Sequence, residues 1–195
     1  MIELVNDYIK NHNIIITSSP NNGMTSVSLC IANILNAEGN SILYYNPTRD
    51  IDRSFIKKHY NNVYKDTVLC HLPQNLFLEF CIDPTIHFDY IIIDPADPLV
   101  IYGSIIPNLI KLTKSNIICT SQIRLDPSNA WKPYSTIEKR FSNFFDYSIW
   151  IRNVSENDLV YKTKYIDVFN KNRIGNQYIS RYIAKMSKNG GHIIF

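Results

Sequence analysis

The chain has 195 residues, of which 45% are hydrophobic and 19% charged, and its formal net charge is +3. This length suits one domain with a single core, and the composition excludes a disordered or low-complexity protein. The mildly basic balance permits a nucleic-acid partner without requiring one.

The sequence gives no sign of export or of a membrane anchor. No N-terminal secretory signal is visible, and no apolar run approaches the roughly 20 residues that a membrane span needs. The four cysteines show no C-x-x-C pairing and are interpreted as buried apolar residues of a reducing compartment: Cys30, Cys70, Cys81 and Cys119. We therefore expect a cytoplasmic protein, or one at a nucleoid or replication site, with no membrane partner. The abundance of Ile, Asn, Lys and Tyr is compatible with an AT-rich, viral genome.

The N-terminal segment predicts a helix, a strand and a second helix in that order. Apolar residues at Ile2, Val5 and Ile9 favour a lead-in helix within residues 1–12. An apolar strand at 13–17, a turn-rich loop at 18–26 and an amphipathic helix at 27–35 follow. This order is typical of a phosphate-binding loop, in which backbone N–H groups at a helix N-terminus surround an anion.

The loop resembles the pattern G-x-x-x-x-G-K-[ST], in altered form. Ser18 replaces the first glycine and Met24 replaces the lysine, whereas Gly23 and Thr25 are kept. Methionine cannot neutralise phosphate charge, although Thr25 could still ligate magnesium. The loop therefore predicts at most weak binding of ATP with Mg²⁺, through Ser18, Asn22, Gly23, Met24, Thr25 and Ser26. The alternative is a plain strand–turn–helix unit in which residues 20–23 form a turn.

Strands and helices alternate through the middle of the chain. We expect strands at 41–46, 67–70, 88–94 and 115–121, and helices at 54–60, 74–81 and 105–113. The continuous apolar run at 88–94 suits a central parallel strand, and it ends in Asp94. That strand resembles a Walker B strand, with Asp94 as a magnesium ligand through water. The alternative is that Asp94 only begins the turn at 94–98.

After Asp146 the pattern changes to polar alternation separated by turns. Segments 147–152, 159–169, 177–186 and 192–195 are strand-like, so we expect antiparallel strands over 147–195 at one edge of the sheet. The order of these predicted strands and helices indicates an α/β fold in one domain, 1–195, with a central, mostly parallel sheet flanked by helices.

Several segments occur in the order found in one family. They are the loop at 18–26, the stretch Tyr45–Asp52, the strand ending at Asp94, the segment Cys119–Arg124 and the late stretch Phe169–Arg173. Together they resemble the ATPase core of RecA-type recombinases, including phage versions and paralogs. The resemblance implies a RecA-like P-loop NTPase fold. It also implies DNA as a partner, with single strands favoured, and homo- or hetero-oligomers with RecA-like subunits.

The resemblance also assigns roles to individual residues. Thr48 stands where the family has the acid that polarises the attacking water, with Asp50 and Asp52 displaced from that position. Gln122 corresponds to the glutamine that senses the nucleotide. Thr25 and Asp94 are the implied magnesium ligands.

Basic and aromatic residues provide the implied DNA contacts. Arg124 and the stretch 125–136, with Trp131 and Lys132, correspond to the start of a mobile DNA-binding loop. Lys171 and Arg173 resemble a basic pair near a neighbouring subunit's phosphates. The alternatives are an ordinary surface loop and a solvated hairpin.

These features leave three hypotheses about function. The first is a catalytically inactive accessory or paralog subunit in DNA recombination, repair or replication, which binds DNA, a partner recombinase or both. The second is an active ATPase or helicase-like motor in which Lys111, Lys114 or a neighbour's Lys171 replaces the missing charge. The third is a non-enzymatic scaffold for protein contacts.

Overall fold

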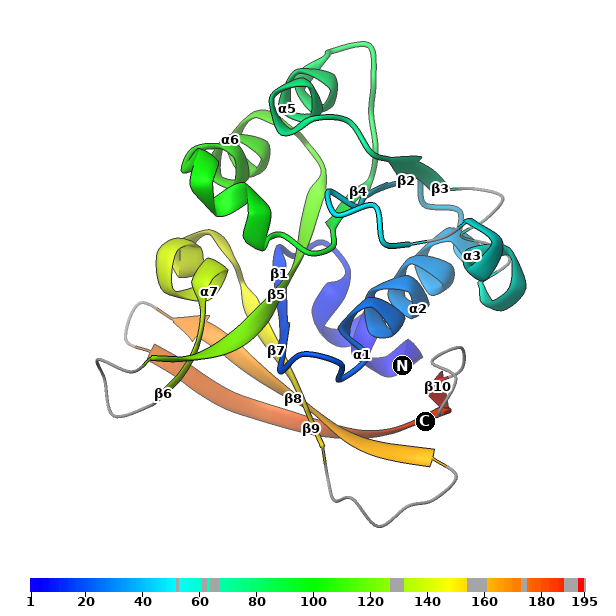
Figure 1. The fold of residues 1–195 in the computed structure, drawn as a ribbon, viewed down its shortest axis with the longest axis vertical. Helices are drawn as coiled ribbons and strands as arrows, with labels where there is room; N and C mark the ends of the chain where they lie inside the picture. Colours follow the sequence, from blue (N-terminus) through cyan, green and yellow to red (C-terminus); the bar gives the residue numbers. More distant parts are fainter. Residues whose placement is uncertain are drawn as a thin grey trace.

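The computed structural model describes residues 1–51, 53–60, 63, 67–126, 132–153, 161–172, 175–187 and 193–194. Its strands form one sheet in the order β10-β9-β8-β7-β1-β5-β4-β2-β3, with β6 paired to β5 (Figure 1). The strands are β1 Ile14–Ser18, β2 Ile42–Tyr45, β3 Thr67–Cys70, β4 Tyr90–Ile93, β5 Asn116–Asp126, β6 Lys132–Ser135, β7 Tyr147–Asn153, β8 Tyr161–Asn172, β9 Gly175–Ser187 and β10 Ile193–Ile194.

The parallel part of the sheet consists of β3, β2, β4, β5, β1 and β7. Every residue of β1, β2 and β4 is buried, because helices cover both faces of these strands. Successive side chains alternate between the two faces, so Ile14 and Ile16 join one core cluster and Ile15 joins the other. The predicted parallel sheet is confirmed.

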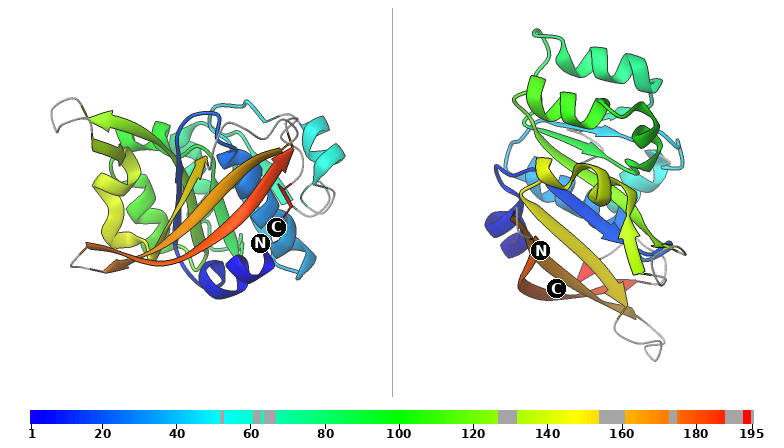
Figure 2. Two further views of the ribbon diagram at one scale, coloured as in Figure 1. Left: turned by 90° about the horizontal axis from the view of Figure 1, so that it is seen from below. Right: turned by 90° about the vertical axis from the view of Figure 1, so that its left-hand side faces the viewer.

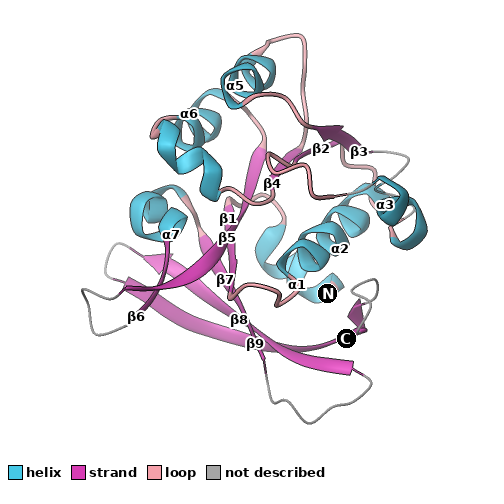
Figure 3. Ribbon diagram, viewed as in Figure 1, coloured by secondary structure: helices cyan, strands magenta, loops and turns pink. Residues whose placement is uncertain are grey.

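The helices form two layers, one on each face of the sheet (Figures 1 and 3). One layer contains α1 Ile2–Leu4, the π-helix η1 Val5–Ile9, α2 Met24–Ala37 and α3 Arg53–His59. The other contains α5 Gln74–Ile82, the 3₁₀ helix η2 Asp97–Tyr102, α6 Ile105–Leu112, α7 Thr136–Phe141 and the 3₁₀ helix η3 Ser142–Phe144. No helix in the described ranges is long and apolar enough to cross a bilayer.

The antiparallel part of the sheet begins one strand later than the sequence predicts. β7 pairs parallel with β1, and after it each of β8, β9 and β10 runs antiparallel to the strand before it (Figure 2). The polar residues of β7 suggested an antiparallel strand at the edge of the sheet, but Ser148 is buried. Its hydroxyl donates to Glu138 of α7 at 3.1 Å and accepts from Trp150 Nε1 at 2.9 Å. At Ser148 and Trp150 the polar alternation therefore marks a hydrogen-bond network with α7, whereas Arg152, further along the same face of the strand, is exposed.

Asn13 ties the central strands together just before β1. Its backbone N–H donates to Asp146 Oδ2 at 2.8 Å, and its side-chain oxygen accepts from the backbone N–H of Ile117 at 2.9 Å. These bonds connect the amino ends of β7, β1 and β5. Because the three strands run parallel, their carboxyl ends come together at the opposite edge of the sheet.

The segment after Arg124 is only partly a loop. β5 continues to Asp126, past the predicted end at Ser121, and pairs antiparallel with β6. We name this β5/β6 pair the β5/β6 arm. Residues 125, 126 and 132–135 of the expected mobile loop thus lie in strands, and Trp131 lies outside the described residues.

Candidate nucleotide-binding site

The carboxyl ends of the parallel strands gather most of the residues that the sequence singled out. Ser18 ends β1, Asp94 follows β4, and Thr48 lies in the turn after β2. Gln122 of β5 lies opposite Ser18 in the parallel register. Open α/β sheets bind their ligands at the carboxyl ends of their parallel strands, so this edge of the sheet, formed by the strand ends, is the candidate site.

The loop between β1 and α2 has the backbone shape that an anion site needs. Asn21 (φ 61°) and Gly23 (φ 82°) adopt the left-handed conformation, and Gly23 is the N-cap of α2. The first helical hydrogen bond runs from the backbone N–H of Val27 to the carbonyl oxygen of Gly23, at 2.9 Å. The remaining N–H groups of this first turn and the dipole of a 14-residue helix therefore attract negative charge at the loop.

The Met24 side chain is buried. It is 8% exposed and belongs to the core cluster beneath α2. Ser18 is also buried, and its hydroxyl donates to the carbonyl oxygen of Ser19 at 3.0 Å. Ser26 is buried too, with its carbonyl oxygen 3.3 Å from the Tyr60 hydroxyl. Residues 18–26 include no lysine or arginine, so the loop itself provides no cation.

Asp94 lies at the centre of a buried group of hydroxyls. Its side chain is 1% exposed, and Oδ2 accepts from the Tyr44 hydroxyl at 2.6 Å and from the Ser28 hydroxyl at 3.3 Å. Thr120 donates to Oδ1, and the Thr25 hydroxyl lies near enough to this carboxylate to lower its pKa. Burial raises the pKa of Asp94, although these hydrogen bonds oppose the rise.

The structure thus places Thr25 and Asp94 beside each other. Hydroxyl and carboxylate oxygens are the ligand types that Mg²⁺ prefers, so this pair fits a magnesium ion that accompanies a nucleotide. Thr25 would hold the ion directly and Asp94 would hold it through water. The bound ion would neutralise phosphate charge.

The turn after β2 holds an acid, although not at the position of Thr48. The buried Asn46 amide donates to the carbonyl oxygen of Asp94 at 2.6 Å and to Asp50 Oδ1 at 2.8 Å. The Thr48 hydroxyl donates to the same Asp50 oxygen at 2.8 Å. Asp50 is therefore anchored at this edge, whereas Asp52 lies outside the described residues.

The expected DNA-binding residues are not gathered at this edge. Arg124 is exposed in the β5/β6 arm, and with Gln122 it lines an open groove of about 470 Å³ beside η2. Lys132 lies in β6, and Arg173 lies outside the described residues. Lys171 lies at the end of β8 that adjoins the start of β7, which is the edge of the sheet opposite to the loop.

Sequence reasoning missed four residues at this site. Tyr44, Ser28 and Thr120 surround Asp94 but come from three separate segments, so no local pattern connects them. The fourth is Lys164 of β8, whose ammonium lies 3.1 Å from Asn22 Oδ1 in the loop. One signal was available for it, because Lys164 shares its strand face with the apolar Ile166 and Val168.

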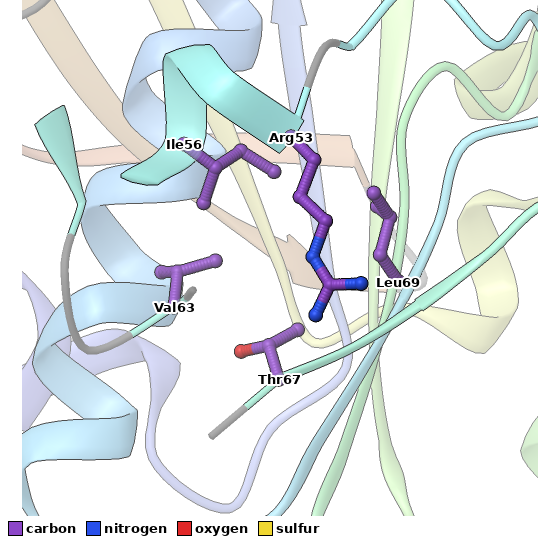
Figure 4. Close-up of a pocket in the computed structure, with 5 residues that line it drawn as sticks. All are labelled: Arg53, Ile56, Val63, Thr67 and Leu69. Atoms are coloured by element: carbon purple, nitrogen blue, oxygen red, sulfur yellow. The ribbon is translucent and has the colours of Figure 1, made fainter. Parts of the chain in front are cut away.

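A separate hollow between α3 and β3 is too small for a nucleotide. It is lined by Arg53, Ile56, Val63, Thr67 and Leu69, and its volume is about 10 Å³ (Figure 4). That volume holds about one water molecule. It has no part in the candidate site.

Comparisons with known proteins agree with this architecture. No protein-family model and no curated protein matches the sequence. The structure of the RadB recombinase superimposes with a TM-score of 0.63 at 10% identity, over 93% of this chain and 89% of that one. The chain has a RecA-like fold. A KaiC-like protein from Pyrococcus horikoshii also matches, with a TM-score of 0.63 at 13% identity, over 95% of this chain and 89% of that one. The RecA-like fold confirms the predicted fold class, and identities this low carry no further conclusion about activity.

Proposed function

We propose that this RecA-like protein is an accessory or paralog subunit in DNA recombination, repair or replication that holds a nucleoside triphosphate without hydrolysing it. One observation carries the proposal. The loop shape, Thr25 and Asp94 are retained at the edge of the sheet, whereas Met24 and Thr48 replace the lysine and the acid. The recombination setting is supported by the likeness to the structure of the RadB recombinase.

The two replacements explain why hydrolysis is not expected. A lysine at the phosphates and an acid beside the attacking water each stabilise the transition state, typically by about 3 kcal/mol. A loss of this size slows the chemical step by about 100-fold, and the two losses act on different parts of the reaction. Binding depends less on them, because the helix N-terminus and a magnesium ion still attract phosphate.

Turnover of ATP tests the proposal most simply. We expect no magnesium-dependent phosphate release above background, with or without single-stranded DNA, while ATP still binds. Asp94→Ala is the matched control because it removes the implied magnesium ligand. Phosphate release that disappears in Asp94→Ala would show an active enzyme and overturn the proposal.

DNA is the proposed macromolecular partner. Arg124 is exposed beside the groove, next to Ile101, whose side chain is 84% exposed. A cation flanked by exposed apolar surface suits contacts with phosphates and bases.

Gel-shift titration with single-stranded DNA at low salt should show binding that weakens in Arg124→Gln. Lys114→Gln is the control, since it removes an equal charge from an exposed residue just before β5, at the opposite edge of the sheet. Equal effects of the two changes would argue against this surface.

One observation favours a second candidate, an active ATPase. Asp50 places a carboxylate at the end of β2, two residues beyond the family's position for the acid. If this acid polarised water, Asp50→Asn would abolish turnover and leave ATP binding unchanged. We expect the wild-type protein to show no ATP turnover, so that Asp50→Asn has no turnover to lose.

A further inference from the structure

Lys164 is a buried cation in an apolar setting. Its side chain is 2% exposed, and it shares its face of β8 with Ile166 and Val168, which pack in the core cluster beneath α2. Lysine is almost never buried to this extent without polar partners, because removing an ammonium from water is costly. Its position therefore calls for an explanation other than packing.

The topology of the sheet brings this lysine to the phosphate loop. β7 runs parallel to β1, so Asn153 at the end of β7 lies at the same edge as the loop. β8 runs antiparallel to β7, and Lys164 lies directly opposite Asn153. The ammonium contacts the side-chain oxygens of Asn153 and Asn22, the second at 3.1 Å. Asn22 immediately precedes Gly23, the N-cap of α2.

Asp167, an acid on the same strand, is paired with two arginines. Asp167 lies three residues further along β8, on the opposite face of the strand, and is buried. Its two carboxylate oxygens accept from Arg181 Nε, at 2.6 Å, and from Arg152. Within the described part of the chain, the contacts of the Lys164 ammonium include the amide oxygens of Asn22 in the loop and of Asn153 at the end of β7.

We propose that Lys164 supplies, from within the same chain, the positive charge that Met24 does not provide, and that it binds the β- and γ-phosphates of a nucleoside triphosphate. This inference rests on the proposed nucleotide-holding function. Phosphate oxygens carry negative charge, and an ammonium binds them more strongly than it binds a neutral amide oxygen. Asn22 Oδ1 therefore holds the ammonium until a phosphate oxygen takes its place.

The test compares ATP and AMP binding by the full chain and its variants, measured by calorimetry in magnesium. Lys164→Met should weaken ATP binding by about tenfold or more, while AMP binding, which involves no β- or γ-phosphate, stays unchanged. Lys164→Arg should keep part of the ATP affinity. Lys185→Met is the matched control, since Lys185 is exposed on the neighbouring strand β9. If Lys164→Met does not fold, Lys164→Gln replaces it, because its amide still reaches polar partners.

The outcomes separate this inference from the function on which it rests. A selective loss of ATP affinity in Lys164→Met, absent in Lys185→Met, would support the role of Lys164. If Thr25→Ala weakens ATP binding and Lys164→Met does not, the role of Lys164 is wrong and the nucleotide-holding function remains. Equal losses for ATP and AMP would indicate a structural role only and overturn the inference. Absence of ATP binding by the wild-type protein would overturn both.

Discussion

The Tyr44 hydroxyl lies 2.6 Å from Oδ2 of Asp94, and both side chains are buried. Burial first, and then the neighbouring carboxylate, raise the pKa of Tyr44 well above its ordinary value, so the phenol keeps its proton and remains a donor. This bond connects β2 to the end of β4 and helps to stabilise the Asp94 carboxylate in the absence of solvent.

Tyr44→Phe should therefore lower the free energy of unfolding by about 2 kcal/mol, since it removes a hydrogen bond to a buried acid. Tyr45→Phe is the control, because the Tyr45 hydroxyl donates to the neutral carbonyl oxygen of Leu72 at 3.0 Å. We expect the control to cost about 1 kcal/mol. Denaturation in urea measures both, and a larger loss for Tyr45→Phe would contradict this account of Asp94.

The left-handed conformation of Gly23 provides a test of the loop. Gly23→Ala should cost about 1–2 kcal/mol of stability, because φ is 82° there, and should also weaken ATP binding by distorting the N-terminus of α2. Gly39→Ala is a matched control with φ 88° and no atom within 4 Å of the added methyl group. It should carry a similar stability cost and leave ATP binding intact. Equal loss of ATP affinity in both variants would show that strain alone is responsible.

The cysteines predict a pH dependence of chemical labelling. Burial raises the pKa of the Cys30 thiol to about 11. At pH 8 about one thiol in a thousand is then ionised in the folded protein, against about one in ten for a cysteine with the ordinary pKa of 9.0. Iodoacetamide should modify Cys30 slowly, with a rate that rises about tenfold per pH unit between 8 and 10. Mass spectrometry with and without denaturant measures this, and fast labelling of the folded protein at pH 8 would contradict it.

The same shift has a consequence for stability in alkali. The folded state holds the Cys30 proton more tightly than the unfolded state, so stability from this group is complete below the unfolded pKa near 9 and falls as pH rises towards 11. Cys30→Ala should reduce that fall. Denaturation curves at pH 8 and pH 10 for both proteins provide the measurement.

The buried position of Met24 predicts that restoring the usual loop lysine fails. Met24→Lys places a charge in the core cluster beneath α2, so we expect it to destabilise the protein by more than about 2 kcal/mol and to produce no turnover. Met24→Leu preserves volume and should cost less than about 1.5 kcal/mol. Thermal unfolding and phosphate release provide the two readouts. ATP turnover in Met24→Lys would show that position 24 faces the phosphates after all.

Local patterns predicted the parts of this fold that depend on neighbouring residues. The apolar run ending in Asp94, and the strand, loop and helix around Gly23, are visible in the sequence because burial and turn chemistry leave short-range signatures. The direction of β7 was not predictable in this way. Ser148 and Trp150 use their polar groups in a hydrogen-bond network with Glu138, so their polar character does not mark an antiparallel edge strand. That network becomes apparent only once α7 is placed.

The candidate site was predicted in part for the same reason. Thr25 and Asp94 follow from their motifs, but the approach of Lys164 to Asn22 depends on the strand order β1-β7-β8 and on the register that pairs Lys164 with Asn153. Neither the strand order nor this register follows from local sequence patterns, because Lys164 and Asn22 lie 142 positions apart in the chain. Asp50 shows a similar limit, since Asn46 anchors its carboxylate at the edge of the sheet two residues beyond the expected position.

Calorimetric titration of the full chain with ATP in magnesium, with phosphate release followed on the same samples, tests the central claim most directly. We predict that the wild-type protein binds ATP, that Thr25→Ala and Asp94→Ala each weaken binding by about tenfold or more, and that no phosphate is released. Absence of binding by the wild-type protein would contradict the claim that the loop still holds a nucleotide. Release of phosphate that either variant abolishes would contradict the claim that the site is inactive.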